Sequence, residues 1–298
     1  MDSLLNNEFF ARLETLAINL SPDLRGFFGG KHRVKTYGQT VEFSDYREYM
    51  LGDDIRRIDW NLYSRFEKYF IKLFTDERQM HLQVFLDCSA SMGQIEPKKA
   101  AYSLAIGAAL GFLSVHNMDK VSFKLMRKSK IEDPSGVIVG KNRFYRAIRA
   151  LEQIEYRSEV NISDAIVGSA DVGGKDGLSV IISDFFNEND WKKAVEYLLY
   201  KKRQVMLVQV MTPEEIDPSY SGRSTLLDSE AGGAEDLKNL KLNITRGLLN
   251  AYEEAIEEYT QEIKEYCNKR GASYILVRCD QPIEKVLFKQ LLKVGVMS

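Results

Sequence analysis

Three oxygen-bearing side chains alternate along "FLDCSASMG", in which Asp87, Ser89 and Ser91 are separated by single small residues. In extended backbone, residues two apart face the same side, so one carboxylate and two hydroxyl groups would converge. Such oxygens are hard ligands that suit Mg2+, Mn2+ or Ca2+ better than Zn2+. Asp184, which ends "LSVIISD", is a further donor, directly or through a water. The pattern predicts a cation site with one coordination position open to an outside ligand, such as a partner's Asp or Glu.

Two other interpretations fit the same residues. The serines could belong to a polar strand-to-helix turn and cap the helix, or Asp87 could be a nucleophile, as in phosphatases. Nucleophilic serines need a nearby base, and the chain has only three histidines. His81 precedes the strand that ends at Asp87, and His116 follows the next helix, so neither is expected near the site. The lack of a candidate acid or base favours binding over catalysis.

The elements that must position these side chains alternate from residue 81 onward. Two apolar runs predict buried strands, "LQVFLD" and "LSVIISD", and "QVMLVQVM" and "ASYILVRC" predict two further strands. The alternating run "KVSFKLM" predicts a half-exposed strand nearer an edge. Helices are predicted over residues 97–115, 141–154, 160–170, 190–202, 248–271 and 283–292. This alternation indicates an α/β fold with a doubly wound, mostly parallel sheet. Ligands bind at the carboxyl ends of such strands, where Asp87 and Asp184 fall.

Two segments lie outside this alternation. Residues 3–20 have the apolar spacing of an amphipathic helix, and an aromatic, charge-dense segment with short strand patterns follows. We therefore divide the chain into an N-terminal part, 1–79, formed by a helix and a small β segment, and an α/β domain, 80–298. Residues 212–245 are turn-rich and acidic, which predicts a loop or hairpin inserted at the edge of the sheet.

Composition limits the classes of function. The chain has 298 residues and a formal net charge of -2, which favours neither nucleic acid nor an anionic membrane as a partner. No apolar stretch reaches the roughly 18 residues of a membrane span, and the N-terminus does not resemble a signal peptide. Three scattered cysteines fit neither a zinc site nor a disulfide framework. We therefore predict a cytoplasmic location, in a reducing compartment.

The upstream motif "GDDIRRIDW" groups charges of both signs beside an aromatic ring. Its residues of interest are Asp53, Asp54, Arg56, Arg57, Asp59 and Trp60. Residues 25–80 contain 11 Lys or Arg and 9 Asp or Glu, a balance that favours mutual pairing over binding of nucleic acid. We expect an ion-pair network that clamps the N-terminal segment to the α/β domain, with Trp60 as a packing anchor.

The motif after the buried strand, together with Asp184, resembles the von Willebrand factor type A domain. The metal-ion-dependent adhesion site of that family uses Asp-x-Ser-x-Ser, a threonine from a second loop and an aspartate from a third. "GQTVEFSDYREYMLGDDIRRIDWNLYSR", followed by "KLFTDERQMHLQVFLDCSASM", is similar to domain-of-unknown-function family fifty-eight (DUF58). This resemblance extends from about residue 9 to near the end of the chain. It implies a non-enzymatic binding and assembly module, and a MoxR-type AAA+ ATPase as partner, because genes of the two families are often neighbours.

One position departs from the adhesion motif. The second-loop threonine is expected near "SEVNISDAI", where Val160 occupies its place. Valine cannot bind a metal, so Asn161 or Ser163 would have to substitute, or Ser158 if the loop shifts. The alternatives to a metal-bridged binding module are a phosphatase-like hydrolase that uses Asp87 and a structural scaffold whose metal site is degenerate.

Overall fold

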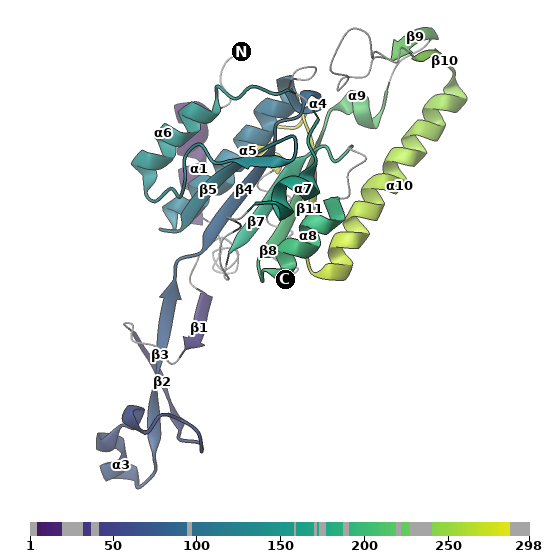
Figure 1. Cartoon of the computed structure of the whole chain (residues 1–298). Helices are drawn as coiled ribbons and strands as arrows, with labels where there is room; N and C mark the ends of the chain where they lie inside the picture. The colour runs from purple at the N-terminus through teal and green to yellow at the C-terminus, as the bar shows by residue number, and fades with distance from the viewer. Residues whose placement is uncertain are drawn as a thin grey trace.

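The computed structural model describes an α/β unit from which a long β arm projects (Figure 1). The described residues are 5–19, 32–36, 42–93, 97–157, 159–169, 172, 177–186, 191–218, 222–226 and 240–286. Within these ranges, no helix combines the length and the apolar character that crossing a bilayer requires.

The α/β unit is built on one six-stranded sheet. Its spatial order is β11 (Ser273–Arg278), β8 (Gln204–Met211), β7 (Leu178–Ser183), β4 (His81–Asp87), β5 (Lys120–Arg127) and β6 (Lys130–Glu132). Neighbouring strands are parallel except β6, which pairs antiparallel with β5. If the six strands of this sheet are renumbered 1 to 6 in chain order, their spatial order is 6-5-4-1-2-3, which is the order of doubly wound folds. The predicted fold class is therefore confirmed, and the winding reverses between β4 and β7.

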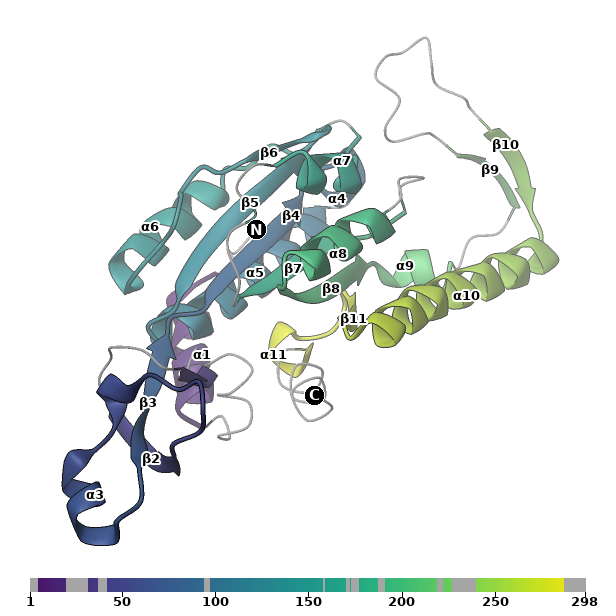
Figure 2. The ribbon, with the colours of Figure 1, turned by 60° about the horizontal axis from the view of Figure 1, so that its bottom comes forward.

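Helices cover both faces of this sheet (Figure 2). One face packs on α1 (Asn7–Asn19), α5 (Pro97–His116), α6 (Lys141–Leu151) and α11 (Ile283–Val286). The other face packs on α7 (Ile162–Val167), α8 (Trp191–Tyr200) and α10 (Arg246–Arg270). Side chains alternate accordingly, since Val84 and Leu86 join the first core and Phe85 joins the second. The predicted helix over 283–292 begins as expected, and its part beyond Val286 lies outside the described residues.

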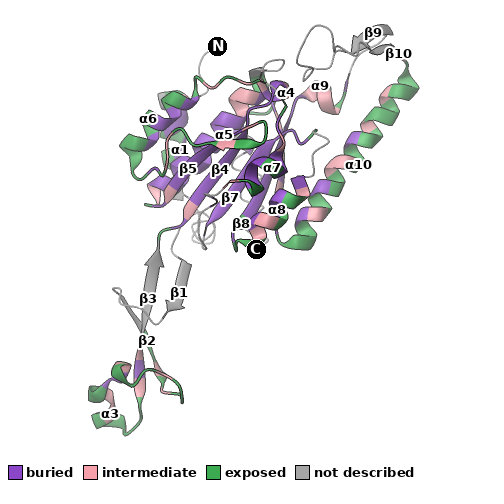
Figure 3. Ribbon diagram, in the orientation of Figure 1, coloured by how far each residue is buried: buried purple, intermediate pink, exposed green. Residues whose placement is uncertain are grey.

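Strand β5 is more deeply buried than its alternating sequence predicts. Its interior residues are buried on both faces, because β6 covers its outer edge and α7 packs nearby (Figure 3). The polar side chains of β5 have internal partners: Lys124 pairs with Asp133 at 2.6 Å, and Ser122 hydrogen-bonds His81. The expectation of a half-exposed strand was wrong because satisfied polar groups can be buried.

The N-terminal part divides between the α/β core and the arm. The Phe10 ring on α1 packs against Phe112 and Phe144, so α1 belongs to the core of the α/β unit. The arm is an antiparallel sheet in the order β1-β3-β2, formed by β1 (His32–Thr36), β2 (Glu42–Glu48) and β3 (Phe70–Arg78). Short helices η1 (Ile55–Arg57) and α3 (Trp60–Phe66) lie toward the far end of the arm (Figure 1). Residues 79 and 80 join β3 directly to β4.

The segment 212–245 contains α9 (Pro213–Ile216), β9 (Gly222–Leu226) and β10 (Leu240–Ile244). Strands β9 and β10 pair with each other as a separate two-stranded sheet rather than extending the edge of the large one. They lie beside the start of α10 in both ribbon views (Figures 1 and 2).

Candidate functional site

The carboxyl ends of β4 and β7 bring two acidic residues together at the reversal point of the sheet. Leu86 pairs with Ile182 in the parallel register, so Asp87 and Ser183 follow as neighbours. The Ser183 hydroxyl donates to Oδ2 of Asp87 at 2.5 Å, and Asp184 is the next residue. Doubly wound folds bind ligands at the carboxyl ends of the strands beside such a reversal point.

A tight turn after β4 places the two serines beside these acids. The Ser89 N–H donates to Oδ1 of Asp87 at 2.8 Å, and the Oγ atoms of Ser89 and Ser91 lie 3.1 Å apart. Ser91 Oγ donates to Oδ2 of Asp184 at 2.9 Å, so the four predicted residues form one connected cluster. The extended backbone that we expected here is wrong, because α4 (Ala90–Gly93) begins directly after Ser89. The side chain of Asp87 instead stabilises a local turn, because its Oδ1 atom accepts the Ser89 N–H.

Burial makes the charge of this cluster costly. Asp87 and Asp184 are each 1% exposed. Burial, and then the charge of Asp184, raise the pKa of Asp87 to about 6, although hydrogen bonds from Ser183 and Ser89 favour its ionised form. Two neighbouring carboxylates inside a protein therefore require a nearby positive charge.

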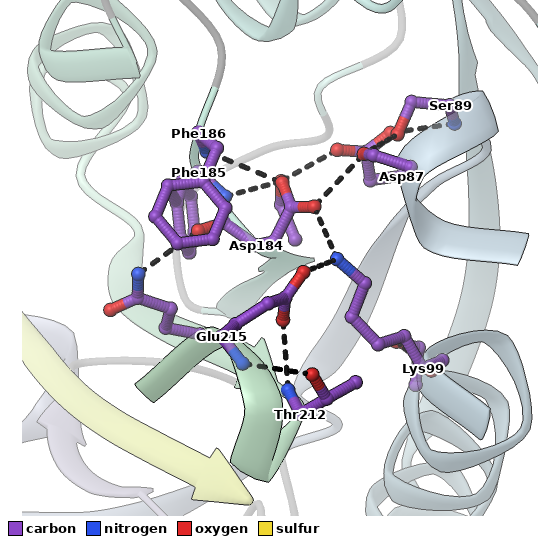
Figure 4. Close-up of polar contacts among 12 residues, drawn as sticks. Asp87, Ser89, Lys99, Asp184, Phe185, Phe186, Thr212 and Glu215 are labelled. Carbon is purple, nitrogen blue, oxygen red and sulfur yellow. Dashed lines mark hydrogen bonds and ion pairs between the residues drawn. The ribbon is translucent and has the colours of Figure 1, made fainter. Parts of the chain in front are cut away.

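Lys99, which the sequence analysis did not identify, supplies such a charge. Its Nζ atom lies 2.8 Å from Oδ2 of Asp184 and 2.6 Å from Oε1 of Glu215 (Figure 4). The Lys99 side chain is 1% exposed, whereas that of Glu215 is 25% exposed. Burial opposes the charged form, but the two acidic partners outweigh it and raise the pKa of Lys99. The ammonium therefore bridges β7 and α9.

Backbone capping fixes the acidic partner on α9. Thr212 and Glu215 form a capping box, in which the Thr212 N–H donates to Oε2 of Glu215 at 2.8 Å. The other carboxylate oxygen, Oε1, thereby stays directed at Lys99. The Tyr252 hydroxyl on α10 donates to the Glu215 carbonyl oxygen at 3.0 Å, so three elements meet at this residue.

Two signals in the sequence could have indicated these residues. Lys99 lies in the first turn of α5, where a cation opposes the helix dipole and therefore calls for a specific acidic partner. The spacing Thr212-x-x-Glu215 is a capping-box pattern. Neither signal reveals that the two side chains meet, because 116 residues separate them.

The described residues of the second loop contribute less than the adhesion motif would require, and Ser158 lies outside the described residues. Val160 is fully buried in the apolar core of the α7 and α8 face and has no ligand atom in its side chain. Asn161 caps α7, since its Oδ1 accepts the Asp164 N–H at 2.8 Å. Ser163 lies in the first turn of α7 and is 6% exposed.

The first-loop residues suit a hard cation in chemical type. Carboxylate and hydroxyl oxygens of Asp87, Ser89, Ser91 and Asp184 adjoin one another, as Mg2+ or Mn2+ prefers. Within the described ranges, no three His, Cys, Asp or Glu side chains cluster as metal ligands would. The serine hydroxyls would therefore have to complete the coordination, beside the charge that Lys99 already provides.

The upstream motif organises the arm itself. Asp53 pairs with Arg47 at 2.9 Å, and Asp59 pairs with Lys72 at 3.0 Å. Asp54 caps η1, to which Arg56 and Arg57 belong. These ion pairs join arm residues to one another, which differs from the predicted clamp onto the α/β domain.

Trp60 is 60% exposed, so its predicted role as a packing anchor is wrong. Its ring meets those of Tyr63 and Tyr69 edge-on. Further large apolar side chains are exposed in the same part of the arm: Met50, Leu51, Ile55, Phe66 and Tyr69. Such a concentration is unusual on a surface that contacts only water.

The sequence of this chain is similar to a known family and to proteins of two bacterial species. Residues 45–259 match the family model described as "Protein of unknown function DUF58". Uncharacterised proteins of Mycobacterium tuberculosis and Mycobacterium bovis are 22% identical over 276 residues, which cover 91% of this chain and 85% of theirs.

Solved structures that match part of this chain include von Willebrand factor type A proteins. The type A protein of Catenulispora acidiphila has a TM-score of 0.44 and 7% identity, and the match covers 75% of this chain and 43% of that one. The SpRpn10 VWA domain has a TM-score of 0.37 and 7% identity, with 74% of this chain and 96% of that one covered.

Proposed function

From the premise that this chain belongs to the DUF58 family, we propose that it is a protein-binding module. Its recognition site would lie where the carboxyl ends of β4 and β7 meet, which we call the recognition edge. The observation that supports this most directly is the hydrogen bond between Ser91 and Asp184, which joins the two strand ends into one cluster. An oxygen-rich cluster at the reversal point of a doubly wound sheet is placed as a ligand site would be.

The site would bind through a divalent cation. Asp87, Ser89 and Ser91 would hold Mg2+, Mn2+ or Ca2+, with Asp184 in support. The bound cation would supply a positive centre for an acidic group of the partner. Ser183 and the turn at Ser89 orient both oxygens of Asp87 before any ligand arrives.

The proposed partner is a MoxR-type AAA+ ATPase, an expectation that rests on the family resemblance. The exposed apolar side chains of the arm support a protein partner, because exposed apolar groups are common where proteins bind one another.

A hydrolase that uses Asp87 is less well supported. A phosphatase-like reaction would need a general acid or base beside Asp87, whereas the groups that donate to its carboxylate oxygens are the Ser183 hydroxyl and the Ser89 N–H. His81 begins the strand that Asp87 ends, so it lies at the opposite edge of the sheet. A scaffold with a degenerate site is the stronger competitor, because Val160 lacks a ligand atom and Lys99 already faces Asp184.

Capture of partners from the native cell tests the proposal. Wild-type protein and Asp87→Ala would be compared with Mg2+ and with a chelator. We expect partners that elute only from wild type in Mg2+. Identical partners in all four conditions would contradict metal-bridged recognition and favour the scaffold. Ser114→Ala is a suitable control, since Ser114 is buried on α5, away from this cluster.

A further inference from the structure

A buried lysine inside an acidic, oxygen-rich site is unexpected if a metal ion is the only cation there. The Lys99 side chain is 1% exposed, and its Nζ atom touches the same oxygen of Asp184 that accepts the Ser91 hydroxyl. The ammonium therefore occupies a position next to the one that a metal ion bound by Ser91 and Asp184 would take. Two positive charges so close together repel each other strongly in a buried environment.

The charges of the cluster suggest how both cations could be accommodated. Asp87, Asp184 and Glu215 carry three negative charges when ionised, and Lys99 carries one positive charge. A divalent cation on Asp87 and Asp184 would balance those two carboxylates, and the ammonium would then balance Glu215. Glu215 already lies 2.6 Å from Nζ and is held there by the capping box of α9. Lys99 can thus give up Asp184 without becoming an unpaired buried charge.

We propose that the Lys99 ammonium competes with the metal ion for Asp184. Glu215 is the alternative partner, with which the ammonium stays paired when it leaves Asp184. This inference rests on the cation site of the proposed function and adds the residues that set its affinity. In the metal-free protein, Lys99 bridges Asp184 and Glu215. When a divalent cation binds, the ammonium pairs with Glu215 alone.

The inference predicts opposite effects for the two residues. Lys99→Met removes the competing charge with little change in side-chain length, so the protein should bind Mn2+ more tightly by roughly tenfold or more. Glu215→Gln removes the alternative partner, so the ammonium stays on Asp184 and Mn2+ binds more weakly, by roughly threefold or more. Glu214→Gln is the matched control, because Glu214 is an exposed neighbour on the same short helix. It should change the Mn2+ affinity less than Glu215→Gln does.

Titration of each purified full-length protein with Mn2+, followed by the electron paramagnetic resonance signal of free Mn2+, measures these affinities. Lys99→Met binding Mn2+ no more tightly than wild type would overturn the inference. Equal effects of Glu215→Gln and Glu214→Gln would overturn it as well, because the effect would then reflect net charge alone. That second comparison remains decisive if Lys99→Met does not fold.

The failure of this inference can be told apart from failure of the proposed function. Mn2+ affinities that do not depend on Lys99 or Glu215 refute the competition and leave the cation site intact, provided that Asp87→Ala abolishes Mn2+ binding. If none of the proteins binds Mn2+, the competition is refuted. The proposed recognition edge then fails only if capture of partners is also unaffected by Asp87→Ala.

Discussion

The Nζ atom of Lys99 lies 2.8 Å from Oδ2 of Asp184, and each side chain is 1% exposed. The two residues come from the first turn of α5 and the end of β7, 85 positions apart in the chain. This buried ion pair connects α5 to the carboxyl end of β7. It is the tertiary contact on which the charge balance of the candidate site depends.

Replacing Lys99 should destabilise the protein in metal-free buffer. Lys99→Met leaves the buried Asp184 without its ammonium partner, and loss of one member of a buried pair costs about 3–5 kcal/mol. We expect the free energy of unfolding in urea to fall by this amount. Lys98→Met is the control, because Lys98 is an exposed neighbour on the same helix turn and should matter by less than about 0.5 kcal/mol. Similar stability of the two variants would show that the ion pair contributes little.

The stability of the metal-free protein should depend on the protonation of Asp87. The folded-state pKa of Asp87 is about 6, whereas an unfolded aspartate titrates near about 3.9. The folded state therefore holds this proton more tightly, and the stability contributed by protonation is fully present below about pH 4. It is lost as the pH rises through about 6, with a total on the order of 1–3 kcal/mol.

Urea unfolding of wild type and Asp87→Asn between pH 4 and pH 7 measures this contribution. The difference in unfolding free energy, wild type minus variant, should decrease as the pH rises. A difference that is constant, or that increases with pH, would show that the folded state does not raise the pKa of Asp87.

Ser183 should orient Asp87 and stabilise the end of β7. Its hydroxyl donates to Oδ2 of Asp87 and accepts the Phe185 N–H at 3.0 Å. Ser183→Ala leaves both buried groups without this partner, which costs about 1–3 kcal/mol. The same change should raise the pKa of Asp87 further, because the lost hydrogen bond favours the ionised form.

Ser114→Ala provides the matched control for this serine. Ser114 is buried, and no hydrogen-bond partner for its Oγ atom occurs among the described residues. Removing the hydroxyl should leave the unfolding free energy unchanged or increase it slightly. If Ser114→Ala destabilised the protein as much as Ser183→Ala, the contact with Asp87 would not explain the effect.

The two tryptophans should differ sharply in their contribution to stability. Trp60 on the arm is 60% exposed, whereas Trp191 on α8 is 4% exposed and packs against Phe185 and Tyr266. Trp191→Ala should lower the unfolding free energy by about 3–5 kcal/mol. Trp60→Ala should change it by less than about 1 kcal/mol. Equal losses in urea unfolding would mean that the arm packs far more tightly in solution than its exposed surface indicates.

The local sequence pattern was sufficient to predict the order of elements and the acidic and serine residues of the candidate site, but not Lys99 or Glu215. The apolar runs that end at Asp87 and Asp184 form parallel strands, and parallel strands align their carboxyl ends at one edge. Their meeting therefore followed from the sequence without knowledge of any side-chain contact. The alternation of β5 misled because it records residue type, whereas the burial of Lys124 depends on Asp133.

The same limit applies to the motif in the arm. Its charge balance correctly suggested mutual pairing, as in the pairs of Asp53 with Arg47 and Asp59 with Lys72. The sequence could not show whether those pairs joined two parts of the molecule or lay within one. The predicted anchoring role of Trp60 depended on a contact with the α/β domain, whereas in the projecting arm its ring is 60% exposed.

The sequence by itself determined the doubly wound sheet and the acidic residues at its carboxyl edge, because strand periodicity and parallel pairing are local rules. Only the tertiary structure decided that Lys99 and Glu215 complete that edge. Lys99 contacts both Asp184 and Glu215 and thereby joins α5, β7 and α9 across 85 and 116 residues. Burial strengthens the attraction between these opposite charges. That burial cannot be read from any single stretch of the sequence.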